Sequence, residues 1–357
     1  MRFRDLAVSE ERALIFGRAP EPVSTPRGLT IGGGTVYPEL NFTVPGNTVV
    51  SRETLPDLTK MYGEIARDAL ERAVALESEG VVLEFEELLE MTQDPHIGTE
   101  ITKVLVDACE TFHSRYGLSC EVRLTPNDTR DFDRPPRMRS GDYLDPMLEM
   151  FDRGARAGGD LLSIESTGGK ELCDDAIMMC DVQQMVFALA VLGVRDMRFL
   201  WQRIAEIGRT NGVRLGGDTA CGFANTAMVL AEKKYIPRTF AALVRVVSAV
   251  RSLVAVEEGA VGPDKDCAYE GPFLKAIAGI PVSMEGKTAA CAHFSQVGNI
   301  AAACADLWSN ESVQNVKLLA GMAPTVSLQQ LVYDVRLMNG AAAGGCDLFL
   351  SHEAPFA

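Results

Sequence analysis

Apolar positions recur along the chain with two alternating spacings, and this alternation predicts an α/β fold. Segments with helical spacing, such as residues 51–80 and 98–117, open on capping residues or close on a glycine. Short apolar runs bounded by glycine or polar turns follow them, as at 81–87 and 120–128, and predict buried strands. A strand after nearly every helix is typical of parallel strands joined by crossover helices.

The pairing of a helix with a strand continues toward the C-terminus. The further predicted helix and strand pairs are 143–159 with 160–169, 197–212 with 213–219, 239–251 with 252–260, 269–279 with 280–288, 291–310 with 315–321, and 328–340 with 347–351. About eight such units without a Gly-x-Gly-x-x-Gly phosphate loop favour a closed (β/α)8 TIM barrel over an open doubly wound sheet. We therefore expect one barrel domain over 51–357, preceded by a short N-terminal extension over 1–50 that is rich in glycine and proline.

Composition excludes several classes of partner. Apolar residues make up 47% and charged residues 23% of the 357 positions, which is enough for a packed core. The formal net charge of −15 repels phosphate backbones, so no nucleic acid is expected to bind. No uninterrupted apolar run reaches the length of about 18 residues that a membrane span needs, so no membrane partner is expected. The charged start lacks a signal-peptide block, and we expect a cytoplasmic protein.

Polar residues follow most of the predicted strands. In a barrel these strand ends meet at one mouth, where the loops carry the chemistry. The residues at these ends are Glu84, Arg123, Asn127, Asp128, Glu165, Asp218, Cys221, Glu257, Glu285 and Lys287. Carboxylates gathered around one mouth repel one another unless a bound metal or a cationic substrate lies among them.

Three of these loops carry zinc-type ligands. Cys221 and Cys267 fall in loops after predicted strands, and Glu165 ends another strand. Two thiolates and one carboxylate form a zinc set with a fourth position open, which is typical of a catalytic site. The alternative is that both cysteines are inert small residues in tight loops. Cys291 also follows a strand end and is a further possible ligand.

Five separated segments resemble one known family. They are "LLSIESTGGKE", "GGDTACGFANTAM", "SLVAVEEGAVGPDKDCAYE", "KAIAGIPVSMEGKTAACAH" and "DLWSNESV". Together they are similar to the zinc-bearing subunit of the methanol:corrinoid methyltransferase family, over residues 30–340. The resemblance implies a (β/α)8 barrel with zinc bound by Glu165, Cys221 and Cys267. It also implies a separate corrinoid protein as partner, and a homodimer.

The reaction implied is transfer of a methyl group from an oxygen atom to the Co(I) of that corrinoid. The methanol enzymes continue well past the last resembling segment, whereas shorter relatives act in O-demethylase systems on methoxylated aromatic compounds. We therefore expect a methoxylated aromatic donor, with methanol as the alternative. Zinc acts in this reaction as a Lewis acid on the leaving oxygen.

Other strand-end residues are assigned to the same site as candidates. Asp218 and Glu257 would deliver a proton or orient the metal ligands, or they cap helices and lie on the surface. Glu84, Arg123 and Asn127 would line the donor pocket. Arg123 would pair with a carboxylate on an aromatic donor, or equally with the acids around it.

Two further functions remain open at this point. A zinc-dependent lyase or hydrolase on the same barrel would hold water at the open position and need a base beside the metal. A non-catalytic protein would use zinc only to shape a docking surface, although closed structural sites usually have four protein ligands.

Overall fold

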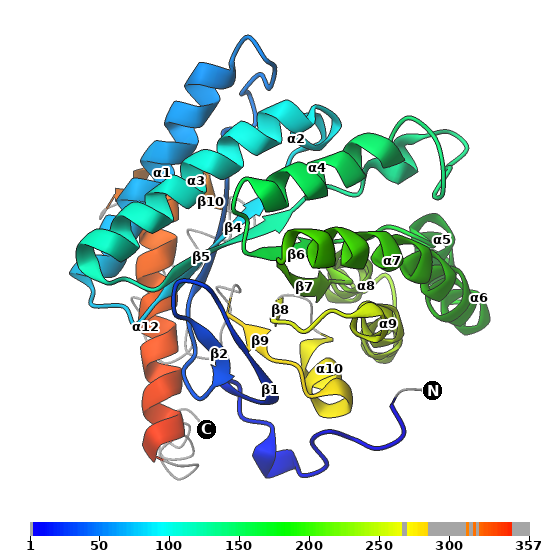
Figure 1. The fold of residues 1–357 in the computed structure, drawn as a ribbon. Helices are drawn as coiled ribbons and strands as arrows, with labels where there is room; N and C mark the ends of the chain where they lie inside the picture. The colour runs from blue at the N-terminus through cyan, green and yellow to red at the C-terminus, as the bar shows by residue number, and fades with distance from the viewer. Residues whose placement is uncertain (1–2, 266–269, 285–311, 314–316, 319–320, 345–357) are drawn as a thin grey trace.

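The computed structural model describes residues 3–265, 270–284, 312–313, 317–318 and 321–344 (Figure 1). Parallel strands and surrounding helices give the α/β architecture that the sequence predicts. One sheet has the strand order β10-β3-β4-β5-β6-β7. Its strands are β3 (Glu39–Thr43), β4 (Val81–Glu86), β5 (Cys120–Thr125), β6 (Leu161–Ile164), β7 (Arg214–Asp218) and β10 (Ser312–Val313). Every neighbouring pair in it is parallel.

The helices pack on one another in chain order around the outside of this sheet (Figure 1). They are α1 (Leu55–Ala75), α2 (Leu89–Gln93), α3 (Pro95–Tyr116), α4 (Leu144–Arg156), α5 (Lys170–Met179), α6 (Val182–Phe187), α7 (Val194–Asn211), α8 (Cys221–Glu232), α9 (Arg238–Glu258), α10 (Gly271–Ala278) and α12 (Ala323–Gly344). A π-helical stretch, Ala188–Gly193, joins α6 to α7. In Figure 1, α12, α1 and α3 lie on one side and α4, α7 and α9 continue around the other.

Local sequence explains where these helices begin and end. The Asp94 side chain caps α3 by accepting from the backbone N–H of His96, and Pro95 fits the first turn, where no N–H is needed. Gly117 ends α3 with φ 69°, a left-handed conformation that costs glycine little. Gly212 ends α7 in the same way. The predicted helices at 51–80, 98–117, 143–159 and 197–212 are therefore confirmed.

The two faces of the central strands differ in polarity. Alternate residues of β4, β5 and β6 pack with the helices in the main hydrophobic core: Leu83, Phe85, Val122, Leu124, Leu162 and Ile164. The residues between them point to the opposite face because side chains alternate along a strand. Near the carboxyl ends these are mostly polar: Glu84, Glu86, Arg123, Thr125 and Ser163. The inner face of the sheet is thus where charged groups meet.

An antiparallel hairpin covers the amino-terminal end of this inner face. It consists of β1 (Arg18–Ser24) and β2 (Thr30–Gly33), drawn beside the sheet in Figure 1. Leu29 and Ile31 pack with Val82 and Leu161 in a separate apolar cluster. The hairpin therefore covers the amino-terminal end of the inner face, and the charged residues lie toward the carboxyl-terminal ends of the strands.

The strands after β7 extend this arrangement. β8 (Asp264–Lys265) pairs in parallel with β9 (Val282–Ser283), and Met284 forms a parallel bridge to Pro38 beside β3. A short antiparallel pair, β11 (Lys317–Leu318) and β12 (Gly321–Met322), precedes α12. The described residues therefore show an α/β sheet with parallel strands, and they do not by themselves show a closed eight-stranded barrel.

Several predicted strands differ from the structure. Residues 252–260, predicted as a strand, instead form the last turns of α9 and its end at Gly259. β3 lies within residues 1–50, so the sheet begins inside the segment assigned to the N-terminal extension. Of the predicted strand 315–321 the structure describes residues 317–318 and 321, and Lys317–Leu318 pairs antiparallel with Gly321–Met322 instead of joining the parallel sheet. The predicted helix 291–310 and strand 347–351 lie outside the described residues.

Helix α9 is the one described helix that is long and apolar enough to cross a membrane. Its apolar residues are largely accounted for by packing, since 56% of its most apolar window is buried. In its middle, Arg251 is fully buried, donates to Ser166, and lies 4.1 Å over the ring of Phe223. These contacts are typical of a core helix, and the absence of a membrane partner stays a prediction.

Candidate functional site

Arg123 forms the centre of a buried polar network on the inner face of the sheet. Nε and Nη2 donate to the two carboxylate oxygens of Glu39 on β3. Nη1 donates to Ser163 Oγ at 2.8 Å and to the Pro263 carbonyl at 2.9 Å. Nη2 also donates to Ser283 Oγ at 3.1 Å. All five guanidinium N–H groups are thereby used, and Arg123 is 1% exposed.

The geometry corrects one predicted role. Arg123 has no N–H group left for a carboxylate on a methyl donor, so the substrate-binding prediction for Arg123 is not supported. The alternative, an ion pair with a neighbouring acid, is what the structure shows. Arg123 therefore holds β3, β5, β6 and β9 together beneath the site.

A row of charges runs from this network toward the open end of the inner face. Lys265 Nζ lies 2.9 Å from Glu84 Oε1 and 3.2 Å from Glu165 Oε1. Glu84 also accepts from Thr125 Oγ1 at 2.7 Å, and both Glu84 and Lys265 are buried. Burial alone would raise the pKa of Glu84, but the nearby cations, led by Lys265, hold it below its usual value. Glu84 is thus ionised and fully buried beneath Glu165, so its side chain is not accessible to a methyl donor.

Glu165 lies one residue past β6 and is the most accessible member of this row. Its side chain is 31% exposed, against 1% for Lys265. Oε1 contacts Lys265 and accepts from Thr219 Oγ1 at 3.2 Å. No hydrogen bond from the described residues reaches Oε2. Glu165 therefore presents one engaged and one open carboxylate oxygen, as a metal ligand held in place by its neighbours would.

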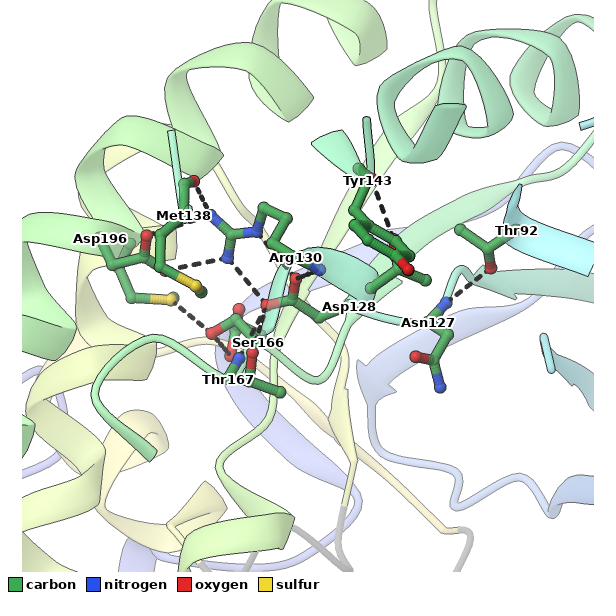
Figure 2. A network of polar contacts seen from close by, with 12 residues as sticks. Thr92, Asn127, Asp128, Arg130, Met138, Tyr143, Ser166, Thr167 and Asp196 are labelled. Carbon is green, nitrogen blue, oxygen red and sulfur yellow. Dashed lines mark hydrogen bonds and ion pairs between the residues drawn. The ribbon is translucent and has the colours of Figure 1, made fainter. Parts of the chain in front are cut away.

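A buried ion-pair network fixes the loop that carries Glu165 (Figure 2). Asp128 accepts from the backbone N–H of Thr167 at 2.8 Å and from its hydroxyl at 3.1 Å. Arg130 bridges Asp128 to Asp196 on α7 through four bonds of 2.8–3.0 Å, and also donates to the Met138 carbonyl. This network ties the loops after β5 and β6 to α7.

Asp218 supports the same loop from the end of β7. It is 1% exposed, and it accepts from Ser166 Oγ at 3.0 Å and from Trp201 Nε1 at 3.1 Å. Burial raises the pKa of Asp218 to about 7, although Arg251 opposes the shift. Since Asp218 holds the residue next to Glu165, its surroundings favour ligand orientation, one of the two roles predicted for it.

Cys221 begins α8 directly after the β7 loop and is 5% exposed. The preceding residue, Ala220, has no side chain that caps the helix. Its backbone N–H instead donates to Glu270 Oε1 at 2.6 Å, and Ser252 Oγ donates to the same oxygen at 2.9 Å. Burial raises the pKa of Glu270 to about 7. The sulfur thus lies at a helix N-terminus, where unpaired N–H groups favour negative charge.

The predicted zinc trio is only partly placed. Glu165 and Cys221 come from neighbouring loops, after the paired strands β6 and β7. Cys267 lies outside the described residues. In the part of the chain that the structure describes, no three His, Cys, Asp or Glu side chains gather as a metal cluster. The open oxygen of Glu165 and the position of Cys221 nevertheless fit a site with carboxylate and thiolate ligands.

Glu257 and Asn127 are placed differently from the other candidates. Glu257 follows no strand, because it lies in the last turn of α9, where it pairs with Arg198 at 2.9 Å near the surface. Its prediction as a residue at a strand end is wrong. Asn127 lies two residues past β5, half-buried, and its backbone N–H donates to Thr92 Oγ1 at 3.0 Å (Figure 2). Its predicted contact with the donor stays a prediction.

Sequence reasoning missed three residues of this site. Lys265, Glu270 and Arg130 make the contacts above, but none was among the candidates. For Lys265 and Glu270 a signal existed, since both lie in the resembling segment around Cys267. The other candidates, Glu285, Lys287 and Cys291, lie outside the described residues.

Comparisons with known proteins identify the family to which the chain belongs. The family model of MtaB, the methanol-cobalamin methyltransferase B subunit, matches residues 1–352. A methanol–corrinoid protein co-methyltransferase from Methanosarcina barkeri (strain Fusaro) is 38% identical over 343 residues, covering 95% of this chain and 74% of that protein. A crystal structure of the methanol:cobalamin methyltransferase complex MtaBC from Methanosarcina barkeri matches with a TM-score of 0.85 and 37% identity, over 96% of this chain and 74% of the other. The chain therefore belongs to the family of methanol-cobalamin methyltransferase B subunits, as its sequence segments predict.

Proposed function

We propose that this chain transfers the methyl group of methanol to the cobalt of a corrinoid carried by a separate protein. One observation carries the proposal: the 38% identity, over 95% of the chain, to a methanol–corrinoid protein co-methyltransferase. The expectation of a methoxylated aromatic donor finds no support in these comparisons. It rested on chain length and was consistent with a free Arg123, whose N–H groups are all engaged.

The proposed metal is Zn²⁺, with Glu165, Cys221 and Cys267 as its ligands. The open oxygen of Glu165 and the position of Cys221 at the start of α8 support this choice. When bound, zinc would supply Lewis acidity to the methanol oxygen. Hydroxide is a poor leaving group, because water has a pKa of about 15.7 against about 10 for a phenol, so methanol needs more help than an aryl ether does.

In the overall reaction the C–O bond of methanol breaks and a C–Co bond forms. The oxygen leaves with the bonding electrons and takes up a proton to give water. Around this chemistry the chain holds Glu165 through Lys265 and Thr219, and fixes the adjacent residues through Asp128 and Asp218. The buried ammonium of Lys265, which contacts Glu165, would also offset part of the negative charge of the site when metal and methanol are bound.

We further propose that the strands close into a (β/α)8 barrel. The parallel pair β8–β9 supports closure, since Val261 N–H donates to the Leu215 carbonyl of β7 and Met284 bridges to Pro38 beside β3. β10 also pairs with β3. The likeness to the MtaBC structure is consistent with this arrangement. A crystal structure with a continuous hydrogen-bonded ring of eight strands would confirm it, and an open sheet would contradict it.

The partner in this proposal is a corrinoid protein, as in the complex to which the chain is similar. Self-association as a homodimer and residence in the cytoplasm rest on family likeness and on composition. Sedimentation of the purified chain tests the first, since a single species of 38.6 kDa would contradict a homodimer.

The experiment that tests the proposal is a donor panel. The zinc-loaded chain is mixed with a reduced corrinoid protein, and loss of Co(I) absorbance is followed with methanol, a methoxybenzoate and a methoxyphenol. We expect methylation from methanol and a much slower reaction with the aryl ethers. Methylation from the aryl ethers alone would contradict the proposed donor.

A pair of variants makes the panel specific to the site. Glu165→Gln keeps the size of the side chain but removes the charge of a predicted ligand, and should lower zinc content and methyl transfer together. Glu258→Gln removes an acid that lies 3.5 Å from Arg198, outside the site, and should change neither. Hydrolysis of a substrate without any corrinoid would favour a zinc-dependent hydrolase instead.

A further inference from the structure

Two described residues flank Cys267 in the sequence, and each contacts the loop of another predicted zinc ligand. Lys265, two positions before it, has its Nζ 3.2 Å from Glu165 Oε1. Glu270, three positions after it, accepts from the backbone N–H of Ala220, the residue before Cys221. The described residues on either side of Cys267 in the sequence thus contact the loops of the other two predicted ligands.

The contact made by Glu270 supplies something that α8 lacks. The first four N–H groups of a helix have no partner within it, and a side chain at the N-cap usually accepts from one of them. The N-cap of α8 is Ala220, which has no acceptor. Glu270 supplies a carboxylate from a different loop, 2.6 Å from the Ala220 nitrogen, at the helix end where negative charge is favoured.

Glu270 is also buried at a cost. It is 0% exposed, and Oε2 has no hydrogen-bond partner in the described part of the chain. Its partners there, Ala220 N–H and Ser252 Oγ, both donate to Oε1. A buried carboxyl group with half of its acceptors unpaired is unfavourable for folding by itself. The structural gain from burying Glu270 is therefore the pair of hydrogen bonds that Oε1 accepts from Ala220 and Ser252.

We propose that Glu270 is a positioning residue for the zinc site. Its carboxyl group holds the start of α8 against the loop after β8, so that the sulfur of Cys221 keeps the direction needed to bind the metal. This inference rests on the proposed function, because it assumes zinc at Glu165, Cys221 and Cys267. Groups that hold metal ligands in place typically contribute a factor of about 10 to 100 in metal affinity.

The test measures zinc affinity in the full chain by competition with a chromophoric chelator, with unfolding of the metal-free protein as a check on folding. In Glu270→Gln the amide oxygen still accepts from Ala220 N–H, so zinc affinity should stay within about threefold of the original. Glu270→Asp keeps the acid but shortens the side chain by one CH₂ group, which withdraws it from Ala220. Its zinc affinity should fall by about 10-fold or more.

Ser252→Ala is the matched control, because it removes the other donor to Glu270 Oε1 and leaves the bond to Ala220. It should keep zinc affinity. Co²⁺ substitution gives a second readout, since sulfur-to-cobalt charge-transfer absorption reports whether Cys221 is bound. We expect weaker absorption in Glu270→Asp than in Glu270→Gln.

The outcomes separate this inference from the function on which it rests. If Glu270→Asp binds zinc as tightly as the original chain, or if Ser252→Ala loses as much affinity, Glu270 is a structural residue only and the inference fails. If the original chain binds no zinc, the proposed metal site fails, and the inference fails with it. Loss of affinity in Glu270→Gln without loss in Glu270→Asp would show that the charge matters and that reach to Ala220 does not, and would overturn the inference.

Discussion

Lys265 Nζ lies 3.2 Å from Glu165 Oε1, so a buried ammonium group touches a predicted zinc ligand. The same nitrogen lies 2.9 Å from Glu84, which is fully buried. One cation thus serves two carboxylates at different depths of the inner face. It compensates the charge of the deeper acid and holds one oxygen of the outer acid.

Replacing Lys265 should therefore be costly. Lys265→Met leaves Glu84 buried without its nearest cation, and loss of one partner from a buried ion pair typically costs about 3–5 kcal/mol. Urea unfolding of the metal-free chain measures this. Lys265→Met combined with Glu84→Gln should recover part of the loss, because no buried charge then remains unpaired. A single variant within about 1 kcal/mol of the original would show that the contact contributes little.

Arg130→Met should destabilise the chain in a pH-dependent way. The change leaves Asp128 and Asp196 buried without their shared cation, at a cost of about 3–5 kcal/mol near neutral pH. Without Arg130 the pKa of both carboxyl groups should rise, so each is protonated at low pH and its burial then costs less. The deficit in unfolding free energy should therefore be smaller at pH 5 than at pH 8. A deficit independent of pH would contradict this explanation.

Glu87 gives a separate pH dependence, and it contacts Thr92, which in turn accepts from the backbone of Asn127. It is buried, accepts from Thr92 Oγ1 at 2.9 Å, and burial raises its pKa to about 8 from 4.5. A raised carboxyl pKa means that the folded chain keeps a proton which the unfolded chain releases. Its contribution to stability is present below about pH 4.5 and is lost as pH rises through about 8.

The variant Glu87→Gln removes this titration. Compared with the original chain, it should gain unfolding free energy by a few kcal/mol between pH 5 and pH 9. The half-buried residue Glu100, which pairs with Lys103 on α3, provides the control, and Glu100→Gln should follow the original chain across the range. A Glu87→Gln variant that also follows the original chain would show that Glu87 titrates normally.

The sequence and the structure give Glu257 different roles, and a variant can decide between them. The sequence assigned it to the catalytic site, whereas the structure places it in α9 beside the half-exposed Arg198. Exposed ion pairs of this kind contribute about 0–1 kcal/mol. Glu257→Gln should therefore leave methyl transfer and zinc content unchanged, with only a small effect on stability. A large loss of activity in a stable variant would return Glu257 to the site.

Patterns within single segments predicted most of the central fold. The strands at 81–87 and 120–128 were predictable because one face of β4 and of β5 packs against helices and is therefore apolar. Glycine or polar residues at the ends of these runs also mark where the strands begin and end. The strand prediction at 252–260 failed because "SLVAV" is rich in valine, and β-branched residues favour strands. In the structure these residues continue the helical packing of α9.

β3 was missed for a different reason. It is five residues long and lies between Pro38 and Pro45, so its pattern resembles a loop. Its assignment depends on pairing with β4, which begins 38 residues after β3 ends. A single sequence does not show such pairing.

The candidate site was predicted in outline because its residues follow strands. Glu165 and Cys221 lie where the pattern places them, after β6 and at the start of α8. Which charged residues are exposed was not predictable. Arg123 is buried because Glu39, 84 positions earlier, lies beside it, and nothing near Arg123 in the sequence indicates this.

The most direct test of the account is methyl transfer from methanol before and after removal of the metal. The purified chain is assayed with a reduced corrinoid protein, stripped with a chelator, assayed again, and then reloaded with Zn²⁺. We predict that the loss of Co(I) absorbance depends on methanol, nearly stops in the stripped protein, and returns with about one zinc per chain. Equal rates before and after stripping would contradict the proposed mechanism.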